Sequence, residues 1–253
     1  MRKRTLTNFV ERPSPNFSER NGEAVEFLVL HYTAMATAEA AIERLCDPAA
    51  QVSSHYVVDE QGVVYRLVSE DKKAWHAGIS YFDGNTDLNF SSVGIEIANP
   101  GNVPFPKAQM DAVIALSRDI VKRHNIRSFY IVGHSDIAPE RKPDPGELFD
   151  WPLLAANNLG VWPSPTAQDY KTSASWGDAE TLRALNRFGY KPGVSLKVLL
   201  TAFQRRFQPE VFKSPARVGT ADADTKARLA CLVRRKNIAD AMRRSKTRRR
   251  GKQ

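Results

Sequence analysis

The stretch FLVLHY at residues 27–32 is an unbroken apolar run that ends at His31 and Tyr32. Such runs are typical of buried β-strands, and functional side chains in mixed α/β folds gather where these strands end. A second run of the same form, FYIVG at residues 129–133, is followed by His134. We therefore expect two buried strands that each bring a histidine to the same edge of a sheet.

A carboxylate follows the second histidine in the loop RKPDPG, residues 141–146, which contains Asp144. Two imidazoles and one carboxylate are a ligand set of catalytic zinc sites, where the fourth position stays open for water. His31, His134 and Asp144 are therefore candidate metal ligands, although the chain has no HExxH or paired CxxC motif. His55 and His76 stay open as alternatives, since their residue type also allows metal binding.

Two further residues fit a hydrolytic site. Glu96 lies inside the apolar run VGIEIA at residues 93–98, where a carboxylate is costly unless it is paired or used. Beside an activated water it would act as general base and then pass the proton to the leaving amine. Lys142 would carry its ammonium close to the metal and stabilise an oxyanion. The alternative readings are an edge-strand glutamate facing solvent and a solvated loop lysine.

The pattern of elements predicts an α/β fold, with a mixed central β-sheet flanked by helices. Residues 56–67 read as a hairpin with a glycine-containing turn, and Thr37 and Pro106 each open an amphipathic helix, the second ending near residues 124–125. Helical periodicity returns at residues 178–190, 195–207 and 222–233, which predicts a small C-terminal three-helix domain. We expect an N-terminal arm at 1–24, a catalytic domain at 25–165, a helical domain at 172–233 and a basic tail at 234–253.

The net charge of +9 is concentrated in the tail. Residues 234–253 hold ten Lys or Arg and one acid, whereas the rest of the chain is neutral. The tail is predicted to be a mobile arm that contacts anionic polymers, or a solvated end without a partner. It lacks the interleaved aromatic residues that stack on bases, so we expect no specific nucleic-acid partner.

Six motifs in one order resemble the type-2 N-acetylmuramoyl-L-alanine amidases, zinc enzymes that share the fold of peptidoglycan recognition proteins. The resemblance covers roughly residues 25–165. The motifs are LHYT at 30–33, SSHYVVDEQG at 53–62, WHAG at 75–78, SVGIE at 92–96, VGHSDIAP at 132–139 and RKPDPG at 141–146.

The resemblance implies that His31, His134 and Asp144 bind zinc, that Glu96 is the catalytic acid/base and that Lys142 steadies the oxyanion. It also implies that His76 faces the substrate rather than the metal, and we expect Trp75 and Asn99 to line the substrate site with it. The reaction would be hydrolysis of the amide that joins the lactyl group of N-acetylmuramic acid to L-alanine of the stem peptide. The substrates would be peptidoglycan fragments, including 1,6-anhydro forms.

Two expectations stay open beside this one. A protein of the same fold can bind muropeptides without cutting them, although here all the ligand positions and Glu96 are filled. The segment from Phe203 to Thr225 resembles peptidoglycan-binding modules, or it is a helical addition that only packs. No stretch approaches the roughly 18 apolar residues of a membrane span, and no apolar segment of a signal peptide follows Met1. We therefore expect a cytoplasmic location, with the periplasm as the alternative that a wall-binding module would favour.

Overall fold

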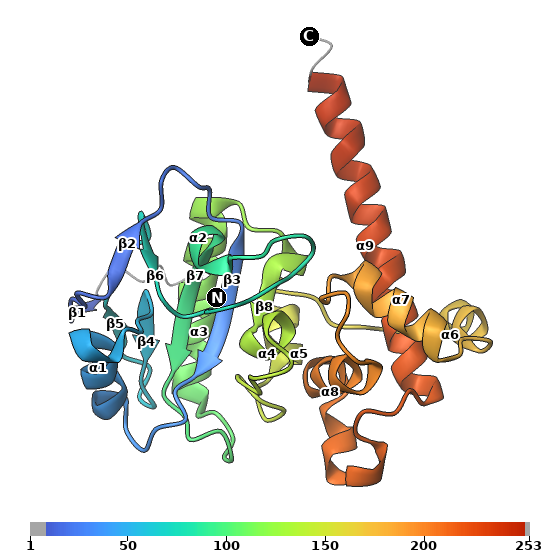
Figure 1. The fold of residues 1–253 in the computed structure, drawn as a ribbon, viewed down its shortest axis with the longest axis horizontal. Coiled ribbons are helices and arrows are strands. Elements are labelled where there is room, and N and C mark those ends of the chain that lie inside the picture. The colour runs from blue at the N-terminus through green and yellow to red at the C-terminus, as the bar shows by residue number, and fades with distance from the viewer. Residues whose placement is uncertain (1–8, 251–253) are drawn as a thin grey trace. The chain divides into compact units, whose positions relative to one another are not determined.

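The computed structural model describes residues 9–250, with side chains as far as residue 245. The chain divides into two compact units between Val161 and Trp162. The first eight residues of the expected N-terminal arm and the last residues of the expected basic tail lie outside this description. Figure 1 shows the elements of both units.

A six-stranded mixed sheet forms the centre of the first unit, in the order β1-β5-β4-β7-β3-β8. Strands β7, β3 and β8 lie side by side and run parallel (Figure 1), while β4 is parallel to β7 and antiparallel to β5. A two-stranded pairing of β2 with β6 lies apart from this sheet. The strands span Val10–Glu11 (β1), Phe17–Glu19 (β2), Phe27–Tyr32 (β3), Tyr56–Val58 (β4), Val64–Arg66 (β5), Lys72–Ala74 (β6), Ser92–Ile97 (β7) and Ile131–Gly133 (β8).

Helices cover the apolar strands, as the mixed pattern predicts. Helix α3 packs across β3, β4 and β7 and lies behind the sheet in Figure 1, and α1 packs on β4. The N-cap of α1 is the expected Thr37, whose side-chain oxygen accepts a hydrogen bond from the backbone N–H of Ala40. The helices of this unit span Ala38–Cys46 (α1), Leu88–Ser91 (α2), Lys107–His124 (α3), His134–Ile137 (α4) and Trp151–Ala156 (α5). The strand expected at residues 129–132 is shifted, because residues 128–130 form a 3₁₀ turn before β8.

The N-terminal arm expected at residues 1–24 forms strand pairings over its described part. Strand β1 pairs with β5, and β2 pairs with β6. Arg20 is only 5% exposed, and its guanidinium donates to the backbone carbonyls of Glu70, Phe90, Lys72 and Ser92, among others. A polar segment can be solvated, but here the guanidinium of Arg20 bonds to the backbone of the strands and loops around it.

The second unit is helical. Its core joins Leu185 and Phe188 of α7 to Leu199 and Phe203 of α8 and Leu229 of α9, all almost fully buried. A short additional helix, α6, precedes the three that periodicity predicts. The helices span Ala167–Ser173 (α6), Asp178–Phe188 (α7), Leu196–Phe207 (α8) and Ala223–Arg250 (α9).

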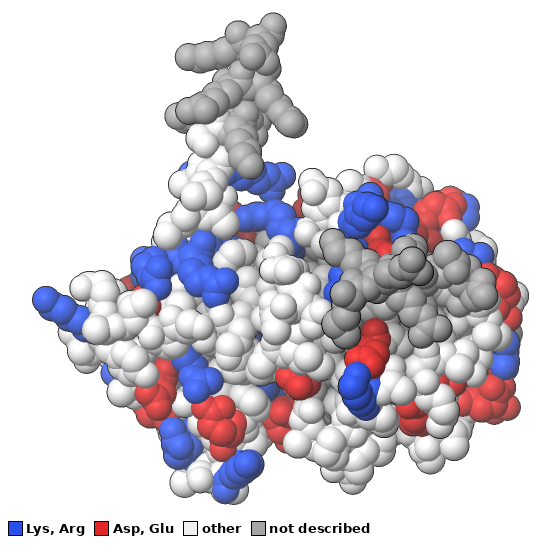
Figure 2. Space-filling model, turned by 180° about the vertical axis from the view of Figure 1, so that it is seen from behind, with Lys and Arg blue, Asp and Glu red and all other residues white. Residues whose placement is uncertain are grey.

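The last helix does not end near Val233, and so the expected boundary between the helical domain and the basic tail lies inside one continuous helix. Helix α9 continues from Ala223 to Arg250. No Gly or Pro interrupts this range, which is rich in the strong helix formers Ala, Arg and Lys. Figure 2 shows Lys and Arg side chains around the described part of this helix. None of the helices within the described residues carries an apolar stretch long enough to cross a membrane.

Candidate active site

The site lies where three parallel strands end. His31 and Glu96 are register partners near the carboxyl ends of β3 and β7, and His134 follows β8 directly. Glu96 is also the register partner of Val57, which packs against Ile42 of α1. Because register partners share a face of the sheet, His31 and Glu96 emerge on the face that α1 covers.

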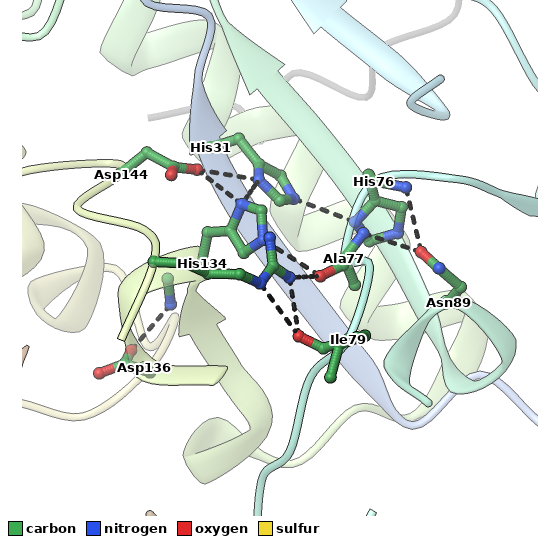
Figure 3. Close-up of polar contacts among 10 residues, drawn as sticks. His31, His76, Ala77, Ile79, Asn89, His134, Asp136 and Asp144 are labelled. Carbon is green, nitrogen blue, oxygen red and sulfur yellow. Dashed lines mark hydrogen bonds and ion pairs between the residues drawn. The ribbon is translucent and has the colours of Figure 1, made fainter. Parts of the chain in front are cut away.

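Three predicted ligands converge at this edge (Figure 3). The Nδ1 atoms of His31 and His134 are 2.9 Å apart, and the Oδ2 atom of Asp144 lies 3.0 Å from the first and 3.1 Å from the second. All three side chains are buried. These ligand atoms form a nearly equilateral triangle, and within the described residues this is the one cluster of its kind that could hold a metal ion.

The triangle fits the base of a tetrahedral site. Zinc bonds of about 2.0–2.1 Å to nitrogen or oxygen separate tetrahedral ligand atoms by about 3.3 Å. The observed edges of 2.9–3.1 Å are slightly shorter, so an ion needs only a small outward shift of the three side chains. A divalent cation with one open position is therefore compatible with the donor set and with its spacing.

The protonation states suit a cation. Burial and the neighbouring His134 lower the pKa of His31 to about 4, so its ring is neutral at pH 7. Burial pushes the pKa of Asp144 upward, but its close contacts with the rings of His134 and His31 outweigh burial and hold the pKa below its usual range. A neutral imidazole and an ionised carboxylate are the forms in which His31 and Asp144 can coordinate a metal.

The loop that carries Asp144 is fixed to the strand end. The backbone N–H of Ser135 donates to the carbonyl of Asp144 at 2.8 Å. Gly133 leaves room for this loop, since a Cβ atom there would lie 2.7 Å from the ring of Pro145. Asp136 accepts from the N–H of Gly133 at 2.8 Å and so closes the turn after β8. A glycine at the end of β8 is thus required for Asp144 to approach His134.

Glu96 has the environment of a proton-transfer group. Its Oε2 atom is buried and has no hydrogen-bond partner. Burial, followed by the negative charge of Asp144, raises the pKa of Glu96 well above its ordinary value, while the charge of Lys142 acts in the opposite direction. A half-buried carboxyl with one buried, unpartnered oxygen beside a candidate metal site is what general acid–base catalysis needs.

A cavity of about 400 Å³ opens onto these groups. It is lined by Glu96, His134, Asp144 and Lys142, and by Trp75 and Arg44 among others. Lys142 therefore faces the same space as His134, Asp144 and Glu96. Arg44 of α1 is a cavity residue that sequence reasoning missed, because an arginine on the polar face of a helix carries no signal that distinguishes it from a solvated one.

The predicted substrate residues have different positions. Trp75 and His76 both line the cavity, and Nε1 of Trp75 donates to Ser18 at 3.0 Å. Asn99 turns to the backbone of its own loop: its Oδ1 accepts from Gly101 at 2.7 Å and its Nδ2 donates to Val103. The structure therefore does not bring Asn99 to the lining of this cavity.

The two alternative histidines lie outside the ligand triangle. His55 is fully buried, and its Nδ1 accepts from the backbone N–H of Gly94 at 3.0 Å. His76 is 9% exposed, and its Nδ1 lies 3.0 Å from the Nε2 of His31. Burial lowers the pKa of both rings, to about 4 for His55 and well below the usual value for His76, so both are neutral.

Comparison with known proteins gives matches over most of the chain. The family model described as N-acetylmuramoyl-L-alanine amidase matches residues 21–147. The N-acetylmuramoyl-L-alanine amidase AmiD of Escherichia coli K12 is 36% identical over 235 residues, a match that covers 83% of this chain and 82% of that protein.

Two solved structures of similar proteins contain a ligand. The complex of AmiD from E. coli with anhydro-N-acetylmuramic acid-L-Ala-D-gamma-Glu-L-Lys matches with a TM-score of 0.74 and 35% identity, and covers 92% of this chain and 93% of that one. AmpDh3 from Pseudomonas aeruginosa in complex with anhydromuramic pentapeptide matches with a TM-score of 0.76 and 28% identity, over 93% and 99% of the two chains.

Proposed function

The chain belongs to the N-acetylmuramoyl-L-alanine amidase family, and from this we propose that it cleaves muropeptides with a zinc ion held by His31, His134 and Asp144. The bond cleaved joins the lactyl carbonyl of N-acetylmuramic acid to the nitrogen of L-alanine. The observation that carries the proposal is the triangle of ligand atoms with 2.9–3.1 Å edges. Two of its residues, His134 and Asp144, line one cavity with Glu96, whose Oε2 atom has no hydrogen-bond partner.

Each residue has a separate role in this proposal. When bound, zinc supplies a Lewis acid and lowers the pKa of a water molecule. Glu96 takes the proton from the attacking water and delivers it to the departing nitrogen of L-alanine. Lys142 presents a positive charge to the carbonyl oxygen, which becomes negative as the water adds. Trp75 forms part of the cavity wall against which the substrate lies.

The proposed substrates are 1,6-anhydro-muropeptides. Two similar structures have ligands of this class, and both matches cover more than nine-tenths of this chain. The expectation that the basic tail contacts anionic polymers stays a proposal, as does peptidoglycan binding by the helical unit. A chain that ends at residue 161 would test both, since it should keep cleavage of soluble fragments and lose retention on isolated sacculi. The expected cytoplasmic location stays a prediction that cell fractionation can test.

The decisive experiment is product analysis by mass spectrometry. Purified full-length protein is incubated with anhydro- and non-anhydro-muropeptides, with zinc and with a chelator, and free stem peptide is measured. We expect release with zinc, none with chelator and none from His134→Ala. Muropeptide binding without release at any zinc concentration would instead identify a non-catalytic binding protein of the same fold.

A further inference from the structure

The segment WHAG at residues 75–78 contacts both candidate histidine ligands on the side away from the ligand triangle (Figure 3). The Nε2 atom of His31 lies 3.0 Å from Nδ1 of His76. The Nε2 atom of His134 lies 3.2 Å from the backbone carbonyl oxygen of Ala77. Two consecutive residues therefore occupy the outer ring nitrogens of two ligands that come from different strands.

The proton positions in the contact between His31 and His76 follow from the hydrogen bond between His76 and Ser92. The hydroxyl of Ser92 donates its single hydrogen to the carbonyl of Leu88, so its oxygen can only accept from Nε2 of His76, 3.1 Å away. The neutral ring of His76 then has its lone pair on Nδ1. That lone pair accepts from Nε2–H of His31, and the remaining nitrogen of His31, Nδ1, carries no proton.

The contact between His134 and Ala77 also leaves Nδ1 of the histidine unprotonated, and here no second side chain is involved. The carbonyl oxygen of Ala77 can only accept, so Nε2 of His134 carries the proton. In a neutral ring Nδ1 is then unprotonated. In this tautomer the lone pairs of two Nδ1 atoms and the carboxylate of Asp144 meet within 3.1 Å, which is the donor arrangement that a cation site needs.

From these contacts we propose that His76 and the carbonyl of Ala77 are positioning groups of the metal site. They hold His31 and His134 in the tautomer that leaves both Nδ1 atoms free for the ion. The inference rests on the proposed zinc site, and it gives His76, which also lines the cavity, a role in orienting a ligand beside the expected contact with the substrate. Hydrogen bonds of this kind fix the tautomer and the ring orientation of metal-binding histidines.

The segment is itself anchored by residues that otherwise have no assigned role. The side-chain oxygen of Asn89 accepts from the backbone N–H of His76 at 3.0 Å and from that of Ala77 at 2.8 Å. Arg141 donates to the carbonyls of Ala77 and Ile79. The Asn89 side chain therefore holds the position of both groups at once.

Strand β7 leaves space for the ring of His76. Gly94 of β7 lies under His76, and a Cβ atom at this position would be 2.6–2.8 Å from the ring atoms of His76. Only a glycine there lets the imidazole reach both Ser92 and His31. The fit explains why the strand that carries Glu96 contains a glycine two residues earlier.

The test is the zinc affinity of full-length variants, measured by competition with a chromophoric chelator. We expect His76→Ala to raise the zinc dissociation constant 10- to 100-fold, the usual effect of removing such a group. His76→Asn is the matched control, since its side-chain oxygen can take the place of Nδ1, and it should recover most of the loss. Asn89→Ala should weaken binding, whereas Asn89→Asp, which keeps the accepting oxygen, should stay near the wild type.

A spectroscopic readout separates orientation from general damage. Long-range ¹H–¹⁵N spectra of the histidine rings in zinc-free protein should show His31 and His134 protonated on Nε2. In His76→Ala, His31 should become a mixture of tautomers while His134 is unchanged. Thermal unfolding in chelator shows whether each variant is folded, and Asn89→Ala keeps the test available if His76→Ala is not.

Two results would overturn the inference while leaving the proposed function intact. One is a proton on Nδ1 of His31 in zinc-free wild-type protein. The other is a His76→Ala variant that keeps wild-type zinc affinity and raises only KM, since this would leave only the substrate-facing role. The proposed function would fail on a different result, namely that wild-type protein loaded with zinc releases no stem peptide.

Discussion

Glu96→Gln separates catalysis from folding and from metal binding. The substitution keeps the shape of the side chain and removes its ability to accept a proton. Because Oε2 has no hydrogen-bond partner, no bond of that atom is lost. Loss of a general acid–base lowers kcat by about 10²–10⁴-fold. This corresponds to about 2.7–5.5 kcal/mol of barrier at about 1.36 kcal/mol per tenfold.

Glu96→Gln should also change the pH dependence of stability, and the raised pKa of Glu96 sets the direction of that change. In zinc-free protein that pKa is raised by burial and by Asp144, so the folded state favours the protonated carboxyl. The unfolded state ionises above about pH 4.3. The wild type therefore loses stability as the pH rises from about 4.3 through the raised pKa of the folded state, whereas glutamine does not titrate. Glu96→Gln should match the wild type at pH 4 and have the higher melting temperature at pH 8.

Three measurements check this prediction: kcat on an anhydro-muropeptide by chromatography of the released peptide, zinc content, and melting temperature in chelator at the two pH values. A variant with kcat within tenfold of the wild type would refute the acid–base role. A variant that has lost zinc would show that Glu96 is a ligand, which contradicts the triangle of His31, His134 and Asp144. Equal stability at pH 8 would refute the argument that burial suppresses ionisation of Glu96.

Further predictions concern other parts of the first unit and zinc itself. Gly94→Ala should displace the ring of His76 and weaken zinc binding at least tenfold while the protein stays folded, which chelator competition and circular dichroism would measure. Lys142→Met should lower kcat by about 10²–10³-fold with zinc retained, as loss of an oxyanion donor does, and an unchanged kcat would remove Lys142 from the mechanism. Arg20→Met should cost about 2–4 kcal/mol of unfolding free energy in urea because it leaves several buried carbonyls unpaired, whereas Arg12→Met, which removes an exposed ion pair, should cost about 1 kcal/mol or less. Zinc at 100 times its dissociation constant should add about 2.7 kcal/mol of stability, and no shift in melting temperature on adding zinc would contradict binding to the folded state.

The positions of the candidate ligands could be predicted from the sequence because they follow apolar strands. His31 and His134 end two runs that must be buried, and parallel strands bring their carboxyl ends together. Asp144 could be added because its loop is only ten residues beyond His134. Local pattern and short separation were sufficient for this part of the site, and the structure brings all three side chains together.

The groups around the ligands could not be predicted in the same way. The type of residue at position 76 is compatible with a ligand, a substrate contact or a positioning group, and only the neighbours of its two ring nitrogens distinguish them. Asn99 was misplaced because its side chain closes a turn onto Gly101. Arg20 left no signal, since its acceptors are backbone carbonyls from separate segments, which sequence patterns do not mark.

The basic tail shows a similar limit. Charge composition indicates that residues 234–250 are solvated, but it does not say whether they are helical. The range has no Gly or Pro and follows directly from a buried helix, so the helix extends without a new nucleation step. At the start of this range, Arg234 forms an ion pair with Asp169 of α6.

The register of β3 against β7 connects the metal site to the proton acceptor. His31 and Glu96 lie opposite each other on neighbouring strands, and both side chains point to the face that α1 covers. A slip of one residue would turn Glu96 to the α3 side and place a carboxylate in an apolar core. Backbone pairing of β3 with β7 on one side and β8 on the other, together with the cost of burying the Glu96 carboxylate, opposes such a slip. The same pairing that stabilises the sheet therefore sets the separation between His31 and Glu96.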